Sequence, residues 1–160
     1  MKLGSTLFLK TALLFIGAPI LALCIFLVPE IAEFAGSLYQ DTVYIKFFVY
    51  GLFYAAAVPF YIALYEAFRL LSYIDRNEAF SDLSVRALKI IKYCAITISI
   101  LFTAGMPLFY LVAEKDDAPG IILIGMVLIF ASMVIAVFAA VLQRLLQEAI
   151  TIKSENDLTV

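Results

Sequence analysis

Residues 120–142 of the chain read GIILIGMVLIFASMVIAVFAAVL, an apolar run that contains no charged side chain. About 20 apolar residues in helical conformation cross the roughly 30 Å of hydrocarbon in a bilayer. Lipid offers no hydrogen-bond partners to the backbone, so a single run of this kind crosses as an α-helix, which satisfies its own N–H and C=O groups. The stretch therefore predicts a transmembrane helix.

Three further runs of spanning length precede it, at residues 11–28, 47–65 and 93–113. The whole chain is 65% hydrophobic and 15% charged, whereas soluble domains are about half apolar and about a quarter charged. This composition excludes a water-soluble domain. We expect one domain covering residues 1–160, an all-α integral membrane four-helix bundle in contact with the lipid bilayer on its outer faces.

The lysines and arginines set the orientation, because short loops rich in positive charge stay in the cytoplasm. Two of them, Lys46 and Lys115, fall on one side of the predicted spans, and nine fall on the other: Lys2, Lys10, Arg69, Arg76, Arg86, Lys89, Lys92, Arg144 and Lys153. The sequence thus predicts a cytoplasmic amino terminus, cytoplasmic loop 66–92 and cytoplasmic tail 143–160. The helical pattern continues past residue 142, so the fourth helix is expected to extend into the cytoplasm.

Catalytic and metal-binding patterns are not evident in the sequence. The chain has no histidine and two cysteines, Cys24 and Cys94, which the predicted topology places near opposite ends of the bundle as free thiols. No phosphate-binding glycine loop, CxxC or HExxH is present. We therefore expect no enzymatic activity, no metal and no cofactor. The cytoplasmic bases fit topology and anionic lipid better than direct nucleic-acid binding.

Tyrosines form a stripe on the second span, where Tyr50, Tyr54, Tyr61 and Tyr65 fall within a narrow sector of one helix. A hydroxyl in hydrocarbon needs a partner, and the third and fourth spans offer Ser99, Thr103 and Ser132. One interpretation is a small polar cavity that binds a ligand. The other is interhelical hydrogen bonding that stabilises the bundle. The candidate ligand-binding residues are Tyr54, Tyr61, Ser99, Thr103 and Ser132.

Small residues also recur at four-residue spacing, as Ser132, Ala136 and Ala140 on the fourth span and as Gly51 and Ala55 on the second. Such faces let helices approach closely, and they fit either packing within the chain or a homo-oligomer. The outer segment 29–42 has apolar residues at helical spacing, which predicts a short helix lying on the outer membrane surface.

Two cytoplasmic elements are candidates for docking a partner. Ser81 is a suitable N-cap for a helix that leads into the third span. Beyond the fourth span, Leu145, Leu146, Ala149 and Ile150 form one helix face, which must be buried against the second helix near Phe68 and Leu71, lipid headgroups or another protein. The candidate docking residues are Arg76, Phe80, Arg86, Leu146 and Ile150.

The central loop carries a family resemblance. Residues 70–81, LLSYIDRNEAFS, and residues 85–93, VRALKIIKY, resemble the central loop of the domain of unknown function 2975 family, and the DAPG turn at 117–120 and the tail KSENDLTV at 153–160 are similar to its members as well. The resemblance implies a small four-span protein of the bacterial cytoplasmic membrane, often encoded beside a helix-turn-helix transcription regulator. It supplies no catalytic residues.

These patterns favour a non-enzymatic membrane protein that binds or regulates a cytoplasmic partner, with a helix-turn-helix transcription regulator as the candidate. The alternative is a small transporter or channel subunit with a polar intramembrane cavity. Against transport, no ionisable side chain occupies the middle of a span, where ion-coupled transporters often place one.

Overall fold

A computed structural model describes residues 2–40 and 44–159 of the chain, and these residues form six consecutive helical elements. They are α1 (Lys2–Ala22), a π-helical segment η1 (Leu23–Leu27), α2 (Val28–Leu38), α3 (Tyr44–Asp75), α4 (Asp82–Lys115) and α5 (Gly120–Thr159). Four helical segments are long and apolar enough to cross a membrane, the first of them running through α1, η1 and α2. The predicted all-α fold with four spanning helices is confirmed.

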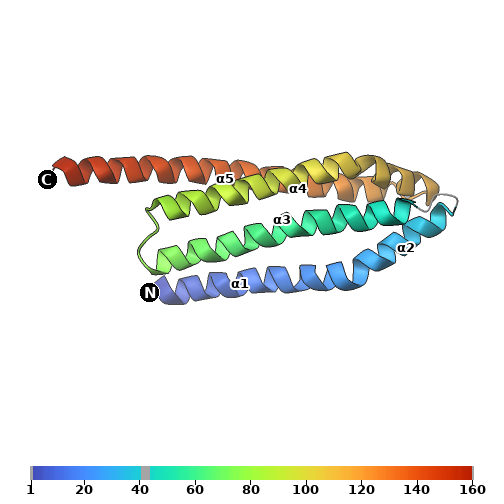
Figure 1. Cartoon of the computed structure of the whole chain (residues 1–160), viewed down its shortest axis with the longest axis horizontal. Helices are drawn as coiled ribbons and strands as arrows, with labels where there is room; N and C mark the ends of the chain where they lie inside the picture. The colour runs from blue at the N-terminus through green and yellow to red at the C-terminus, as the bar shows by residue number, and fades with distance from the viewer. Residues whose placement is uncertain (1, 41–43, 160) are drawn as a thin grey trace.

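The helices pack in the order of the chain, as Figure 1 shows. α1 and α2 lie against α3, α3 lies against α4, and α4 lies against α5. Within the described residues, α1 and α5 make no direct helix-to-helix contact. The amino terminus, the α3–α4 connection and the carboxyl terminus lie at one end of the molecule, and α5 extends past the other helices there (Figure 1). This arrangement places both termini on one side, as the positive charges predict.

Residues 29–38 of the outer segment are helical, but this helix packs on α3 and α4, whereas the sequence suggested a helix on the membrane surface; residues 41 and 42 of the segment lie outside the described residues. α2 continues directly from α1 through η1, and Val28, Ala32 and Ala35 are buried. Ala32 and Ala35 form an apolar cluster with Ile45 and Val49 of α3 and Val112 of α4. The small alanine side chains let α2 approach α3 closely, so it packs inside the bundle.

The helices α3 and α4 end in the same way, at the α3–α4 and α4–α5 connections. Asn77 and Asp117 have positive φ values of 61° and 54°, a left-handed conformation that Asn and Asp tolerate. In each case the next N–H reaches back five residues, from Glu78 to the Tyr73 carbonyl at 2.8 Å and from Ala118 to the Ala113 carbonyl at 2.9 Å. This is the Schellman pattern of helix termination.

Ser81 occupies the N-cap position of α4, as predicted, with extended φ and ψ. Its hydroxyl makes no capping hydrogen bond and donates to the Glu78 carbonyl at 2.6 Å. The serine therefore closes the α3–α4 connection and leaves the first N–H groups of α4 to other partners.

Small residues form the α4–α5 contact. Ser132, Ala136 and Ala139 of α5 are buried, and α4 is the one described element against which α5 packs. The small-residue face of the fourth span thus serves packing within the chain. Gly51 on α3 is exposed, and a Cβ added there would meet nothing within 4 Å. For the Gly51 and Ala55 face, a homo-oligomer contact stays a prediction.

Candidate functional site

An apolar cleft of about 580 Å³ lies between the helices at the depth of the predicted spans. Its walls are α1 with η1 on one side and α5 on the other, from Leu13 to Cys24 and from Leu128 to Ile135, and its floor includes Ala56, Ala57 and Ala95 of α3 and α4. The volume is within the range of small-molecule sites. The lining is apolar except for the Cys24 thiol and the Ser132 hydroxyl. The cleft could therefore recognise a ligand by its shape and by hydrophobic contact, and not by hydrogen bonds.

Of the five residues predicted to bind a ligand, Ser132 alone lines this cleft. Its hydroxyl donates to the Leu128 carbonyl of its own helix at 2.8 Å. Thr103 likewise donates to the Ser99 carbonyl at 2.7 Å and is exposed, while Ser99 is buried. These i to i−4 bonds satisfy the Thr103 and Ser132 hydroxyls within a single helix, and neither Ser99 nor Thr103 lines the cleft with Ser132. A ligand-binding role for them stays a prediction.

The two tyrosines form the interhelical hydrogen bonds that the second interpretation predicted. The Tyr54 hydroxyl donates to the Cys24 carbonyl at 3.0 Å, and the Tyr61 hydroxyl donates to the Gly17 carbonyl at 2.8 Å. Gly17 permits this approach, because a Cβ there would lie 2.7 Å from Cδ2 of Leu64. Tyr61 thus connects α3 to α1, and Tyr54 connects α3 to η1.

The Cys24 carbonyl needs this partner because of Pro29. In η1, the Val28 N–H bonds to the Leu23 carbonyl, five residues back. In the same π pattern the Cys24 carbonyl would take the N–H of residue 29, and proline has none. Tyr54 supplies the missing donor. The proline was visible in the sequence, but the π segment that assigns its orphaned carbonyl to residue 24 was not.

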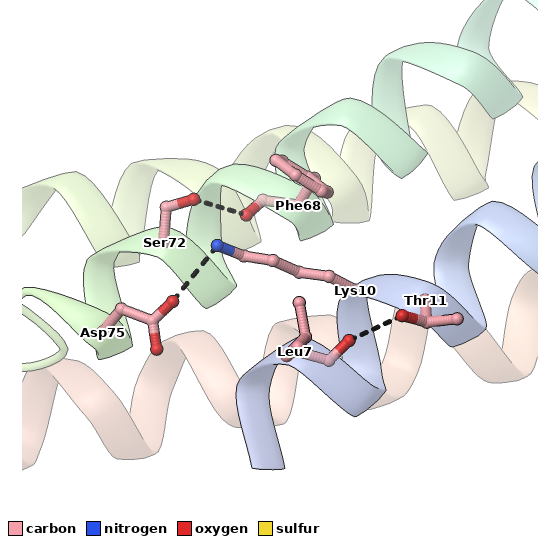
Figure 2. Close-up of polar contacts among 6 residues, drawn as sticks. All are labelled: Leu7, Lys10, Thr11, Phe68, Ser72 and Asp75. Atoms are coloured by element: carbon pink, nitrogen blue, oxygen red, sulfur yellow. Dashed lines mark hydrogen bonds and ion pairs between the residues drawn. The ribbon is translucent and has the colours of Figure 1, made fainter. Parts of the chain in front are cut away.

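A third connection joins α1 to α3 near the end that carries the termini. Lys10 Nζ lies 3.1 Å from Asp75 Oδ2, and the two side chains are 21% and 17% exposed. The ammonium also lies 5.0 Å from the centre of the Phe68 ring. Figure 2 shows the lysine reaching across from α1 to the last turn of α3. The anchoring positions, residues 10 and 17 of α1 and residue 24 of η1, are spaced by seven and therefore share one face.

A buried carboxylate occupies the same end of α3. The Glu66 side chain is 8% exposed, and Arg69 Nη1 lies 3.3 Å from its Oε1. Arg69 Nη2 also donates to the Tyr73 hydroxyl at 2.6 Å. Arg144 does not pair with Glu66, because its Nε lies 3.7 Å from Oε1 of Glu148 on its own helix. The Glu66–Arg69 pair is local to one helix.

The predicted docking residues divide into two groups. Arg76, Phe80 and Arg86 are exposed around the α3–α4 connection. Leu146 and Ile150 are half-buried, and α5 packs on α4 rather than on α3 near Phe68 and Leu71. The sequence missed Ile152, which is 66% exposed, and Leu158, which is 85% exposed. The packing of α5 on α4 decides which apolar side chains of α5 are buried. The spacing of apolar residues along α5 does not reveal which helix it packs on.

The family of proteins of unknown function DUF2975 has a sequence model that matches residues 30–160. The chain belongs to the DUF2975 family. It is similar to the protein named uncharacterized membrane protein YoaS of Bacillus subtilis (strain 168), with 70% identity over 156 residues that cover 98% of each chain. No solved structure matches.

The relative is named a membrane protein, in agreement with the four helices of spanning length in this structure. The chain is a multi-pass membrane protein with four helices of spanning length. The family match begins at residue 30, so it covers α3, α4, α5 and most of α2. The apolar cleft is bordered by these DUF2975 helices and by α1 and η1, which precede the matched region.

Proposed function

We propose that this membrane protein is not an enzyme and that it docks a cytoplasmic protein partner, a helix-turn-helix transcription regulator, on the end formed by the α3–α4 connection and the free end of α5. The observation that carries the proposal is the exposure of every residue from Thr151 to Leu158 on a helix that continues to Thr159. The side chains of this helix end are therefore accessible to another molecule.

Apolar side chains on this end need a cover. At the α3–α4 connection and the start of α4, Phe80 is 55% exposed and Leu83 is 44% exposed, and Ile152 and Leu158 are strongly exposed on α5. Both regions lie at the same end of the molecule (Figure 1), and exposed apolar side chains gathered at one end mark interaction sites more often than isolated ones do. Arg76 and Arg86 are exposed at this end as well, and arginine is enriched at protein interfaces.

Lipid headgroups cannot provide that cover if the fourth span ends near residue 142. At 1.5 Å per residue, Ile152 stands about 15 Å beyond the hydrocarbon. The headgroup layer adds only about 5–7 Å on each side of the bilayer. A protein partner therefore covers this end better than the membrane surface does.

Site-specific photo-crosslinking in the native bacterium tests the proposal. A benzophenone amino acid at position 152 is expected to capture one discrete cytoplasmic protein, identified by mass spectrometry as a DNA-binding regulator. The control is the same amino acid at position 137, since Val137 is 61% exposed on the same helix but lies in the predicted span. Adding Phe80→Asp should remove the adduct at position 152. Adducts at position 152 that contain only lipid or other copies of the chain would contradict docking at this end.

The transporter alternative is not proposed. It required a polar intramembrane cavity, and the hydroxyls of Tyr54 and Tyr61 are bonded to backbone carbonyls of η1 and α1. The cleft that the described helices enclose is apolar, which gives no path for an ion.

A further inference from the structure

The apolar cleft leaves a space between α1 and α5 that no side chain of the described residues fills. α1 and α5 border it from opposite sides, and within residues 2–40 and 44–159 these two helices make no direct contact. Its lining residues fall almost entirely within the predicted spans. We propose that the cleft binds an acyl chain of a bilayer phospholipid between α1 and α5.

The cleft is held open by the connections that fix α1 on α3. Lys10 to Asp75, Tyr61 to Gly17 and Tyr54 to Cys24 bind the same face of α1 and η1 at three heights. Moving α1 across to α5 would break these contacts, and two of them lie in hydrocarbon, where an unpaired carbonyl or hydroxyl is costly. These contacts therefore keep α1 apart from α5 and keep the cleft open.

The chemistry of the lining excludes water as the occupant. Ser132 already donates its hydroxyl to the Leu128 carbonyl, and Cys24 contributes a weakly polar thiol. A buried water needs two to four polar partners, and apolar cavities stay dry. Hydrocarbon is the medium that surrounds the cleft at this depth.

The volume of the cleft fits one acyl chain. If each chain carbon takes about the 30 Å³ that a water molecule takes in the liquid, the 580 Å³ of the cleft holds on the order of 20 carbons. That is the size of one lipid acyl chain.

The proposal is independent of docking at the α5 end and is tested in a purified system. The full-length protein is placed in vesicles of phosphatidylethanolamine and phosphatidylglycerol that contain a trace of phospholipid with a diazirine in its acyl chain. After irradiation, mass spectrometry maps the labelled residues. Ile16 and Ile135, on the two walls, should be labelled more strongly than Val58 and Phe130, which are 61% and 70% exposed outside the cleft.

A matched pair of variants gives the decisive comparison. Ala57 lines the cleft, whereas Ala55 is exposed two residues away on the same helix, about 200° around it. Ala57→Phe should reduce labelling of Ile16 and Ile135 about tenfold by filling the space. Ala55→Phe should leave it unchanged. If Ala57→Phe does not fold, Ala131→Phe repeats the test from the opposite wall.

Three results would overturn the proposal. The first is equal labelling of cleft and outward positions, which indicates bulk lipid only. The second is cleft labelling that both phenylalanine variants leave unchanged. The third is cleft labelling by a free diazirine fatty acid but not by the diazirine phospholipid, which would assign the cleft to a different ligand.

Discussion

Replacing Gly105 by leucine is expected to separate α3 from α4 and to lower the free energy of unfolding by about 3 kcal/mol. A Cβ at Gly105 would lie 2.5 Å from Cδ2, 2.9 Å from Cδ1 and 3.2 Å from Cγ of Leu52. The whole branched end of Leu52 is in the way, so no rotation of one methyl relieves the overlap. Nearby, Phe53 of α3 packs edge-on against Phe102 and Phe109 of α4, which limits how far Leu52 can move.

Gly51 provides the control for this substitution. A Cβ there meets nothing within 4 Å, so Gly51→Leu should be neutral or stabilising by less than about 1 kcal/mol through helix propensity. Unfolding of the purified variants in detergent, followed by circular dichroism, measures both. Equal destabilisation of the two variants would mean that Gly105 is not at a close contact between α3 and α4.

Removing the Lys10 ammonium is expected to give the second large effect. Lys10→Met leaves the Asp75 carboxylate, which is 17% exposed, without its cation and should cost about 2 kcal/mol. Asp75→Asn should cost a similar amount. Exchanging the two residues, Lys10→Asp with Asp75→Lys, should restore most of the stability, because the pair forms again with reversed polarity.

The exchange variant also separates pairing from topology. It keeps the net charge on the end with both termini constant, so orientation in the membrane should not change. Lys89→Met is the control for loss of a positive charge alone, because Lys89 is exposed on α4. A stability loss in Lys89→Met as large as that in Lys10→Met would contradict a specific role for the Lys10–Asp75 pair.

The sequence predicted the four helices of spanning length correctly because hydrocarbon leaves few alternatives to apolar helices. The same reasoning fails for α2, because an apolar helix face can be covered either by the membrane surface or by another helix. The spacing of Ile31, Phe34 and Leu38 predicts a helix on the membrane surface, but Ala32 and Ala35 are buried against α3 and α4, and Ile31 and Leu38 pack against the same cluster. A small-residue face was the signal, and it was visible in the sequence.

The candidate site was less predictable for a different reason. The cleft depends on α1 packing on α3 without reaching α5, and hydropathy carries no information on the order in which spans pack. The tyrosine stripe did indicate that hydroxyls needed partners, and interhelical hydrogen bonding was one of the two interpretations. That the partners are backbone carbonyls at Cys24 and Gly17 depends on the π segment and on a glycine, which the stripe does not reveal.

Docking at the free end of α5 requires that this end faces the cytoplasm, and cysteine labelling in intact cells tests this directly. On a background of Cys24→Ala and Cys94→Ala, four single replacements are compared: Ser37→Cys, Asp116→Cys, Glu78→Cys and Glu155→Cys. All four positions are exposed, so access depends only on the side of the membrane. A membrane-impermeant maleimide should modify cysteines 37 and 116 in intact cells and reach 78 and 155 only after permeabilisation. Modification of 78 and 155 in intact cells would place the free end of α5 outside and contradict the proposed function.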